Sequence, residues 1–281
     1  MVELPESVVL SKEINQLLKG KIIKKAIAAK SPHKFAWYHG EPEEYDILLA
    51  NKKITSAQQQ GGHVEIIADD MVILLSEGIR IRYYYKNDPI PDKHQLFIGF
   101  DDGSSLIVTV QMYAGILAFK QGTYEDKYYM AAVNKPSPLS DEFDFSYFHQ
   151  LISSVPVKMS LKAFLATEQR IPGLGNGVLQ DILFNAKMHP KRKINTLTIS
   201  DMELLFESIK ITLNHMVKLG GRDTEQDLFG QQGGYVTKLS KNTVNQPCPE
   251  CRTLIHKQAY MGGSIYFCEH CQPIEIVEAI S

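Results

Sequence analysis

All four cysteines of the chain lie in two pairs near its C-terminal end, and their spacing suits a metal ion. The pairs are CPEC at 248–251 and CEHC at 268–271. A CxxC turn presents two thiolates to one tetrahedral ion, so two such turns complete a four-thiolate zinc site. Disulfides or unrelated core cysteines are the alternatives, and disulfides are disfavoured because no secretion signal is evident. We therefore predict one structural zinc ion per chain, with ligands Cys248, Cys251, Cys268 and Cys271.

A second group of reactive residues lies in the N-terminal sequence MVELPE. Valine is small enough for the initiator methionine to be removed, which leaves Val2 with a free α-amine. Such an amine has a pKa of about 7.7–8.0, so part of it is an uncharged nucleophile near neutral pH. The carboxylates of Glu3 and Glu6 lie on either side of the rigid Leu4-Pro5 step. Taken alone, these residues are more readily explained as an ordinary solvated terminus.

A third candidate is the glycine-rich stretch EQRIPGLGNGVLQD at 168–181. Its proline and glycines, including Gly173 and Gly175, cannot all lie inside a helix, so it is a tight turn with exposed backbone N–H groups. A turn of this kind at a helix N-terminus favours phosphate, and Asn176 adds a side-chain amide. The basic run HPKRK at 189–193 follows, with Lys191 and Arg192. A plain helix–helix connection and a solvated helix end are the alternatives for these two stretches.

The first half of the chain that positions these residues is predicted to be mostly β-structure. A helix is expected from Pro5 to Leu18, where apolar residues recur near helical spacing. The stretches 64–75, 80–85 and 94–111 are rich in β-branched and aromatic residues, and 94–111 forms a hairpin around Asp101-Asp102-Gly103. We assign residues 1–133 to an N-terminal β-domain and the proline-containing stretch 134–144 to a linker.

The second half is predicted to be helical up to the cysteines. Helical patterns occur at 146–154, 160–169, 178–188 and 200–220, the last starting at a Ser200 N-cap with Glu203 as its capping-box partner. These helices make a domain at 145–240. Residues 241–281 form the cysteine-bearing tail, in which two apolar runs around Gly262-Gly263 predict a metal-clamped β-hairpin. The fold class is therefore multidomain α+β.

These features occur in the same order in one known family. ELPE at the terminus, a β-rich first domain, LATEQRIPGLGNGVLQDILFNAKMHPKR and a four-cysteine finger ending CEHCQ resemble the formamidopyrimidine-DNA glycosylase and endonuclease VIII family of base-excision repair enzymes. The resemblance spans nearly the whole chain. It implies an N-terminal two-sheet β-sandwich, a helix–two-turns–helix domain and a zinc finger, with DNA bound in the cleft between the two domains.

The resemblance also assigns roles to residues. The family's nucleophile is the amine that follows the initiator methionine, here that of Val2, which attacks the sugar C1′ of a flipped-out nucleotide. Glu3 matches the group that transfers protons, and Glu6 matches a second carboxylate beside the site. Asn176 matches an asparagine that binds phosphate. Tyr113, in QMYAG at 111–115, matches the side chain that enters the DNA stack.

Two expected basic residues are replaced. Gly62 stands where the family usually has a lysine in a loop of the first domain, and Gly263 where the finger hairpin usually carries an arginine. The stretch 220–240 is a candidate loop over the damaged base, with Arg222, Asp223 and Thr224 offering polar contacts, and a plain connector to the finger is an equal alternative.

Together these features predict a DNA glycosylase and AP lyase that acts on double-stranded DNA with oxidised bases or abasic sites. A catalytically weakened or inactive protein that binds damaged DNA is the alternative, and a structured RNA is a third, weaker candidate ligand. At 281 residues, 44% hydrophobic and with a formal net charge of −2, the chain is typical of a soluble globular protein without a general basic field. We expect a monomer with no membrane segment, in the cytoplasm or, if bacterial, associated with the nucleoid.

Overall fold

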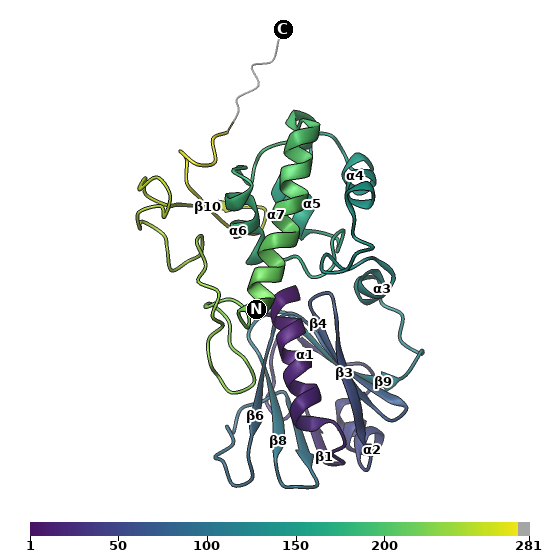
Figure 1. The fold of residues 1–281 in the computed structure, drawn as a ribbon. Helices are drawn as coiled ribbons and strands as arrows, with labels where there is room; N and C mark the ends of the chain where they lie inside the picture. The colour runs from purple at the N-terminus through teal and green to yellow at the C-terminus, as the bar shows by residue number, and fades with distance from the viewer. Residues whose placement is uncertain (275–281) are drawn as a thin grey trace. The chain divides into compact units, whose positions relative to one another are not determined.

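The computed structural model describes residues 1–274 and divides the chain into two compact units. The first unit contains Met1–Val133 together with Val217–Tyr235, and the second contains Asn134–Met216 together with the chain from Val236 onward (Figure 1). The sequence analysis assigned the whole of 145–240 to the helical domain. The structure instead places Val217–Tyr235 with the β-domain, and the candidate active site depends on this difference.

The first unit contains the predicted pair of β-sheets. One sheet has four strands in the order β1-β7-β8-β6, and the other has five in the order β2-β9-β5-β4-β3. Neighbouring strands are antiparallel, except that β2 and β9 run parallel. The strands are β1 (Ile23–Ala28), β2 (Ala36–Trp37), β3 (Ile54–Gln60), β4 (His63–Ala68), β5 (Met71–Leu75), β6 (Ile79–Tyr84), β7 (Leu96–Phe100), β8 (Ser105–Val110) and β9 (Ala114–Lys120).

Several strands follow directly from the local sequence. The predicted hairpin between β7 and β8 is confirmed, and its turn contains Gly103 with φ +84°. The single run predicted at 64–75 is two strands, because Asp69 adopts a left-handed conformation (φ +51°) and reverses the chain. The sequence analysis named no strand at β1, β3 or β9. Two adjacent lysines interrupt the apolar pattern of β1, so these strands carry a weaker signal than the buried β5.

The first helix, α1 (Leu4–Leu18), fixes the N-terminus against the sheet (Figure 1). It packs on β3 and β4 through buried residues that include Leu10, Ile14 and Leu18. Asn15 accepts a hydrogen bond from the Ala57 N–H at 2.8 Å, which pins the helix to the edge strand β3. Two further helices in this unit, the 3-10 helix η1 (Pro42–Glu44) and α2 (Tyr45–Leu49), cover the other end of the strands.

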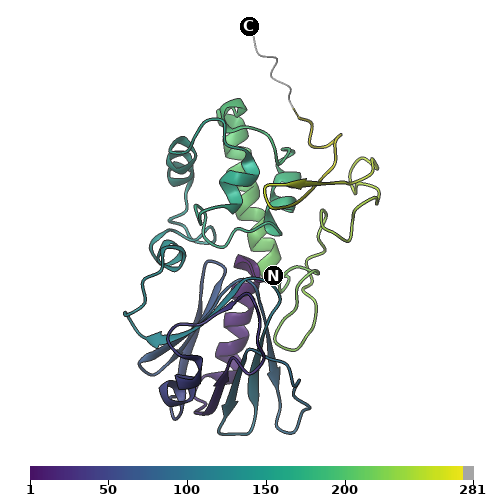
Figure 2. The same cartoon turned by 180° about the vertical axis from the view of Figure 1, so that it is seen from behind.

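The second unit is helical and carries the β-hairpin of the cysteine tail (Figure 2). Its core contains the fully buried side chains of Phe143, Phe148, Phe164 and Phe184. None of the described helices is long and apolar enough to cross a membrane. The remaining elements are α3 (Lys127–Asn134), α4 (Phe145–Ser153), α5 (Leu161–Ala166), α6 (Val178–Asn185), η2 (Ile194–Thr196), α7 (Ile199–Lys218), β10 (His256–Tyr260) and β11 (Gly263–Phe267).

The N-terminus of α7 differs from the prediction by two residues. The capping box pairs Thr198 with Asp201: the Asp201 N–H donates to Thr198 Oγ1 at 3.1 Å, and the Thr198 N–H donates to Asp201 Oδ2 at 2.9 Å. Both candidate pairs have the spacing of a capping box, and Asp201 is also held by Arg192. This additional ion pair favours the earlier start over Ser200 and Glu203.

Candidate active site

The N-terminus of α1 brings two predicted site residues, Glu3 and Glu6, into one buried cluster. Glu3 precedes the helix and Glu6 lies in its first turn, where the helix dipole favours negative charge. The Glu3 N–H donates to Glu6 Oε2 at 3.1 Å. Both side chains are buried. Two buried carboxylates this close need a cation, because an unpaired buried charge is costly.

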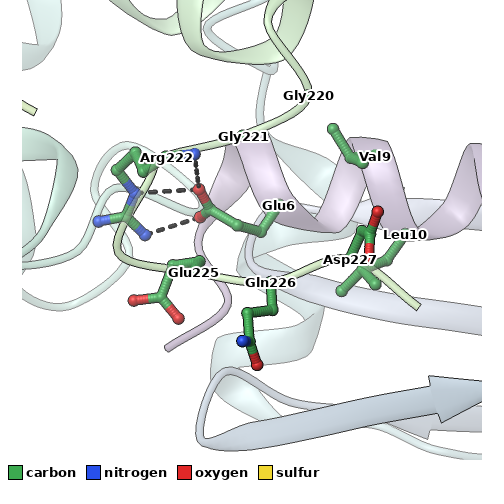
Figure 3. Close-up of a pocket in the computed structure, with 9 residues that line it drawn as sticks. All are labelled: Glu6, Val9, Leu10, Gly220, Gly221, Arg222, Glu225, Gln226 and Asp227. Carbon is green, nitrogen blue, oxygen red and sulfur yellow. Dashed lines mark hydrogen bonds and ion pairs between the residues drawn. The ribbon is translucent and has the colours of Figure 1, made fainter. Parts of the chain in front are cut away.

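That cation is Arg222, which is only 2% exposed. Its Nε and Nη2 donate to the two oxygens of Glu6 at 3.0 and 2.7 Å, and its backbone N–H also donates to Glu6 Oε1 at 3.1 Å (Figure 3). Nη1 lies 3.3 Å from Glu3 Oε2. Burial acts to raise the pKa of Glu6, but the charge and hydrogen bonds of Arg222 outweigh burial and hold that pKa below its ordinary value. Glu6 is therefore a carboxylate near neutral pH.

Val2 lies beside this cluster with Met1 still attached. The Val2 side chain is buried, and its backbone N–H donates to the Glu77 carbonyl at 2.9 Å. The Met1 ammonium forms an ion pair with Glu225, and the Met1 carbonyl accepts a hydrogen bond from Arg222 Nη2 at 3.2 Å. The nitrogen of Val2 is an amide in this state. It becomes a nucleophilic amine only when Met1 is removed.

The segment that supplies Arg222 is anchored in the β-domain. Leu228 is fully buried in the core of the first unit, and its carbonyl accepts a hydrogen bond from the Tyr83 N–H at 2.9 Å. Gly233 lies so close to Gly221 that a Cβ at Gly233 would be 2.2 Å from the Gly221 carbonyl carbon. The sequence analysis offered Arg222 as a polar contact to a damaged base. The structure contradicts this role, because both carboxylates hold its guanidinium.

An acidic residue lies beside Gly62, where the family resemblance implies a lysine. A Cβ at Gly62 would lie 2.9 Å from Glu77 Cγ and 3.0 Å from Glu77 Oε1. The space beside this loop is therefore occupied by a carboxyl side chain. The carbonyl of the same residue accepts the Val2 N–H, so Glu77 lies next to the N-terminal site through its backbone as well.

In the second unit, the glycine turn holds the finger hairpin. Gly173 has φ +78°, and its N–H donates to Gln169 Oε1 at 3.0 Å, while the Gly175 carbonyl accepts from the Leu179 N–H. Asn176 Nδ2 donates to the carbonyl of Ser264 in β11 at 2.9 Å. Asn176 Oδ1 is buried and has no hydrogen-bond partner among residues 1–274. This oxygen is free to accept a proton donor.

Two lysines surround the hairpin turn next to Asn176. The Lys162 and Lys191 ammonium groups lie 5.8 and 5.2 Å from the centre of the Tyr260 ring, and Lys162 also donates to the Tyr260 carbonyl. Burial lowers the pKa of Lys162. A Cβ at Gly263 would lie 3.3 Å from Lys162 Nζ. Within the described chain neither lysine has a carboxylate partner.

The other members of the basic run are committed to the fold. Arg192 donates to both oxygens of Asp201, at 3.2 and 2.7 Å, so this ion pair takes up the charge that the sequence analysis assigned to DNA. His189 is buried, and burial together with the charge of Lys191 lowers its pKa to about 4. His189 is thus uncharged near neutral pH. Lys191 remains as the member of the run that meets the hairpin turn.

The four cysteines form one cluster suited to a metal ion. Their Sγ atoms all lie within 4.8 Å of one another, with 3.8 Å between Cys248 and Cys271 and 3.4 Å between Cys251 and Cys268. Zinc–sulfur bonds of about 2.3 Å in a tetrahedron place sulfur atoms about 3.8 Å apart. All four cysteines are free thiols. The separations fit a tetrahedral ion, and β10 and β11 form the predicted hairpin between the two pairs.

Tyr113 is exposed in the loop between β8 and β9, where its ring contacts Phe35 and Trp37. The sequence analysis did not identify these two neighbours or the roles of Lys162 and Glu77. Lys162 is one lysine among many in the sequence, and only the fold places it against the hairpin. A run of aromatic residues at 35–38 was the one local signal for the neighbours of Tyr113.

Comparison with known proteins identifies the same family. The chain matches the model of the formamidopyrimidine-DNA glycosylase H2TH domain over residues 135–227. It is 29% identical to a formamidopyrimidine-DNA glycosylase of Cytobacillus firmus, covering 97% of this chain and 100% of that protein. The corresponding protein of Streptococcus pneumoniae is 26% identical over 97% of this chain and 99% of its own length.

The solved structures agree on the fold. The MutM (Fpg) protein of Thermus thermophilus superimposes with a TM-score of 0.80 at 20% identity, covering 97% of this chain and 99% of that one. The Lactococcus lactis Fpg bound to DNA with an abasic site gives 0.79 at 23% identity, covering 96% and 99%. With these matches and the predicted sandwich, helical domain and cysteine hairpin, the chain is a member of the formamidopyrimidine-DNA glycosylase and endonuclease VIII family.

Proposed function

We propose that this protein is a base-excision DNA glycosylase with AP lyase activity, whose nucleophile is the amine of Val2. The observation that carries the proposal is the buried cluster of Glu3, Glu6 and Arg222 around the start of a chain that matches formamidopyrimidine-DNA glycosylases along its length. Relatives of this fold bind DNA with abasic sites, as the Lactococcus lactis complex does. Double-stranded DNA with a damaged base or an abasic site is the substrate that fits.

The chemistry requires an uncharged amine and a group that moves protons. The Val2 nitrogen forms a bond to C1′ of the sugar while the bond from C1′ to the base breaks, and the base leaves with the electron pair and takes up a proton. Loss of the C2′ proton from the resulting Schiff base then expels the 3′ phosphate. Glu3 is the proposed proton carrier. Glu6, held on three sides by Arg222 and Glu3, is a positioning residue.

Removal of Met1 rearranges the site in a defined way. It releases Glu225 from its ion pair and frees the Arg222 Nη2 donor that now binds the Met1 carbonyl. A polar donor and a carboxylate therefore become available beside the new amine. Processing of Met1 is the step that would turn this buried terminus into an active site.

The second unit supplies the proposed phosphate contacts and a structural metal. Asn176, Lys162 and Lys191 surround the hairpin turn, where Gly263 has no side chain that could block them. Gly173 and Gly175 shape the adjoining turn. We assign one zinc ion to the four cysteines. With four protein thiolates the ion has no open position, so its role is to hold the hairpin.

Borohydride trapping tests the nucleophile directly. Protein whose mature N-terminus is shown by mass to be Val2 should become covalently linked to an abasic duplex in the presence of borohydride. Trapping should increase as the pH rises through the range of an α-amine, about 7–8, because only the neutral amine attacks. Protein with an acetylated terminus is the matched control and should bind the duplex without being trapped. Glu3→Gln should retain binding and slow base release.

One observation favours a protein that binds damaged DNA without processing it. Glu77 places a carboxyl side chain beside Gly62 and also holds the Val2 nitrogen in a hydrogen bond. Negative charge at this position opposes the approach of a phosphate. If mature protein retains Met1, or binds abasic duplex but is never trapped on it, the binding role replaces the enzymatic one.

A further inference from the structure

The first unit exposes a cluster of three aromatic rings that the proposed chemistry does not use. The Tyr113 ring lies 4.3 Å from Phe35 and 5.7 Å from Trp37, centre to centre, and its plane is within 11° of that of Trp37. Trp37 is 51% exposed and Tyr113 is 57% exposed. We call these three side chains the aromatic platform. Large aromatic rings are seldom left half in water, so such a cluster indicates a binding surface.

The backbone holds the platform in place. β2, which carries Trp37, pairs in parallel with the start of β9, and the Ala114 N–H donates to the Phe35 carbonyl at 2.9 Å. The N–H groups of Gln111 and Met112 both donate to the Gly78 carbonyl, at 2.8 and 3.2 Å. The rings are thus positioned before any ligand arrives. A preorganised surface loses little conformational entropy on binding.

The chain around two of the rings is positively charged. Residues 28–40 include Lys30 and Lys34 and contain no aspartate or glutamate. Lys34 Nζ lies 5.3 Å from the centre of the Phe35 ring. Within the described chain neither lysine forms an ion pair. A flat aromatic surface beside unpaired lysines is the combination that binds single-stranded nucleic acid, since bases stack on rings and cations attract phosphates.

We propose that the aromatic platform stacks unpaired bases of single-stranded DNA. This goes beyond the proposed glycosylase, because binding an intact single strand needs neither the Val2 amine nor a lesion. A protein partner with an apolar surface would leave the two lysines unmatched, whereas DNA satisfies both the rings and the charges. The platform would let the protein hold a strand whose bases are already unpaired.

Trp37 provides a direct readout, because it is the only tryptophan in the chain. A short oligothymidylate should quench its fluorescence in a saturable titration. An oligonucleotide of equal length built from abasic tetrahydrofuran residues carries the same phosphates without bases and should leave the emission nearly unchanged. Equal quenching by the two would overturn the proposal, since it would show that phosphates alone are recognised.

Two variants test whether the rings carry the binding. Tyr113→Leu should weaken oligothymidylate binding by at least about fivefold, the loss expected for one stacking partner. Tyr85→Leu is the matched control: Tyr85 is also 57% exposed and lies in the same unit, and its loss should leave affinity unchanged. Unchanged affinity in Tyr113→Leu, measured on protein with the melting temperature of the parent, would refute the platform.

The terminus provides the separation from the glycosylase proposal. Protein acetylated at its N-terminus should still show quenching by oligothymidylate at the parent affinity, although it cannot be trapped. Loss of quenching on acetylation would contradict the platform, because it would place single-strand binding at the N-terminal site. Failed trapping with intact quenching would remove the enzymatic proposal and leave this one standing.

Discussion

Arg222 is the residue on which the candidate active site depends most strongly. Its guanidinium is surrounded by Glu3, Glu6 and the Met1 carbonyl, and it is almost completely buried. Coulomb attraction within such a site is strong, and so is the cost of desolvating every charge in it. The arrangement therefore contributes little net stability as an intact set. Removing one member leaves the others buried and unpaired.

Arg222→Met should lower the free energy of unfolding at pH 7 by about 3–5 kcal/mol, because two buried carboxylates lose their counter-ion. In the parent protein the pKa of Glu6 lies below its ordinary value, so this stabilisation is present above pH 4.5 and is lost as the pH falls through the lowered pKa. In the variant, burial without a cation raises the carboxyl pKa values. Its stability should then increase on acidification below neutral pH, which denaturant titrations across pH 4–7 measure.

Arg222→Lys is the control that separates charge from geometry. A lysine keeps one positive charge but cannot donate to both oxygens of Glu6 at once. We expect an intermediate loss of stability with the parent direction of pH dependence. A methionine variant with parent stability at pH 7 would show that the three groups are solvated in solution and not paired as described.

At the scale of elements, the finger hairpin is held by few apolar contacts and needs its metal. The buried cluster around it consists of Phe184, Leu239, Ile255, Cys248 and Cys268. A core this small is insufficient to order β10 and β11 alone. Asn176 and Gln180 add hydrogen bonds to the Ser264 carbonyl, which couple the glycine turn to β11. Loss of the metal should therefore disturb the proposed phosphate contacts.

Metal analysis and chelation test this element. Protein purified without added zinc should contain about one equivalent, and removal of the metal should expose the backbone amides of β10 and β11 to hydrogen exchange. The strands of the first unit should keep their protection. Cys251→Ser should show the same pattern, with reduced zinc content. Full protection of the hairpin in metal-free protein with four free thiols would contradict the assignment.

The sequence predicts those elements whose signals are local. The cysteine pairs, α1 and the hairpin at Gly103 each lie within a short stretch whose spacing or turn chemistry specifies the structure. The site contacts are different, because Glu6 and Arg222 are separated by 216 positions. No local pattern links them. The same holds for Lys162 and Tyr260, which meet only after α5 and the hairpin have folded.

At the scale of the whole molecule, a net charge of −2 limits how nucleic acid can be bound. A neutral body gives no long-range attraction, so affinity for DNA must come from a few placed cations. The basic run contributes little of this charge, since His189 is uncharged and Arg192 is paired with Asp201. The two lysines at Tyr260 remain as the placed cations of the second unit.

The salt dependence of DNA binding measures this directly. Each phosphate neutralised on duplex DNA contributes a slope of about −0.9 in a plot of log affinity against log salt concentration, so contacts by Lys162 and Lys191 predict a slope of about −2. On a duplex containing a tetrahydrofuran abasic analogue, Lys191→Met should weaken binding and reduce the slope by about 1.

Lys241→Met, which removes an exposed lysine of the same unit, should leave both quantities unchanged. A steep slope that Lys191→Met does not alter would place the DNA on another surface. Since few charges are available, such a result would also show that cations outside the hairpin turn compensate for the glycines at 62 and 263.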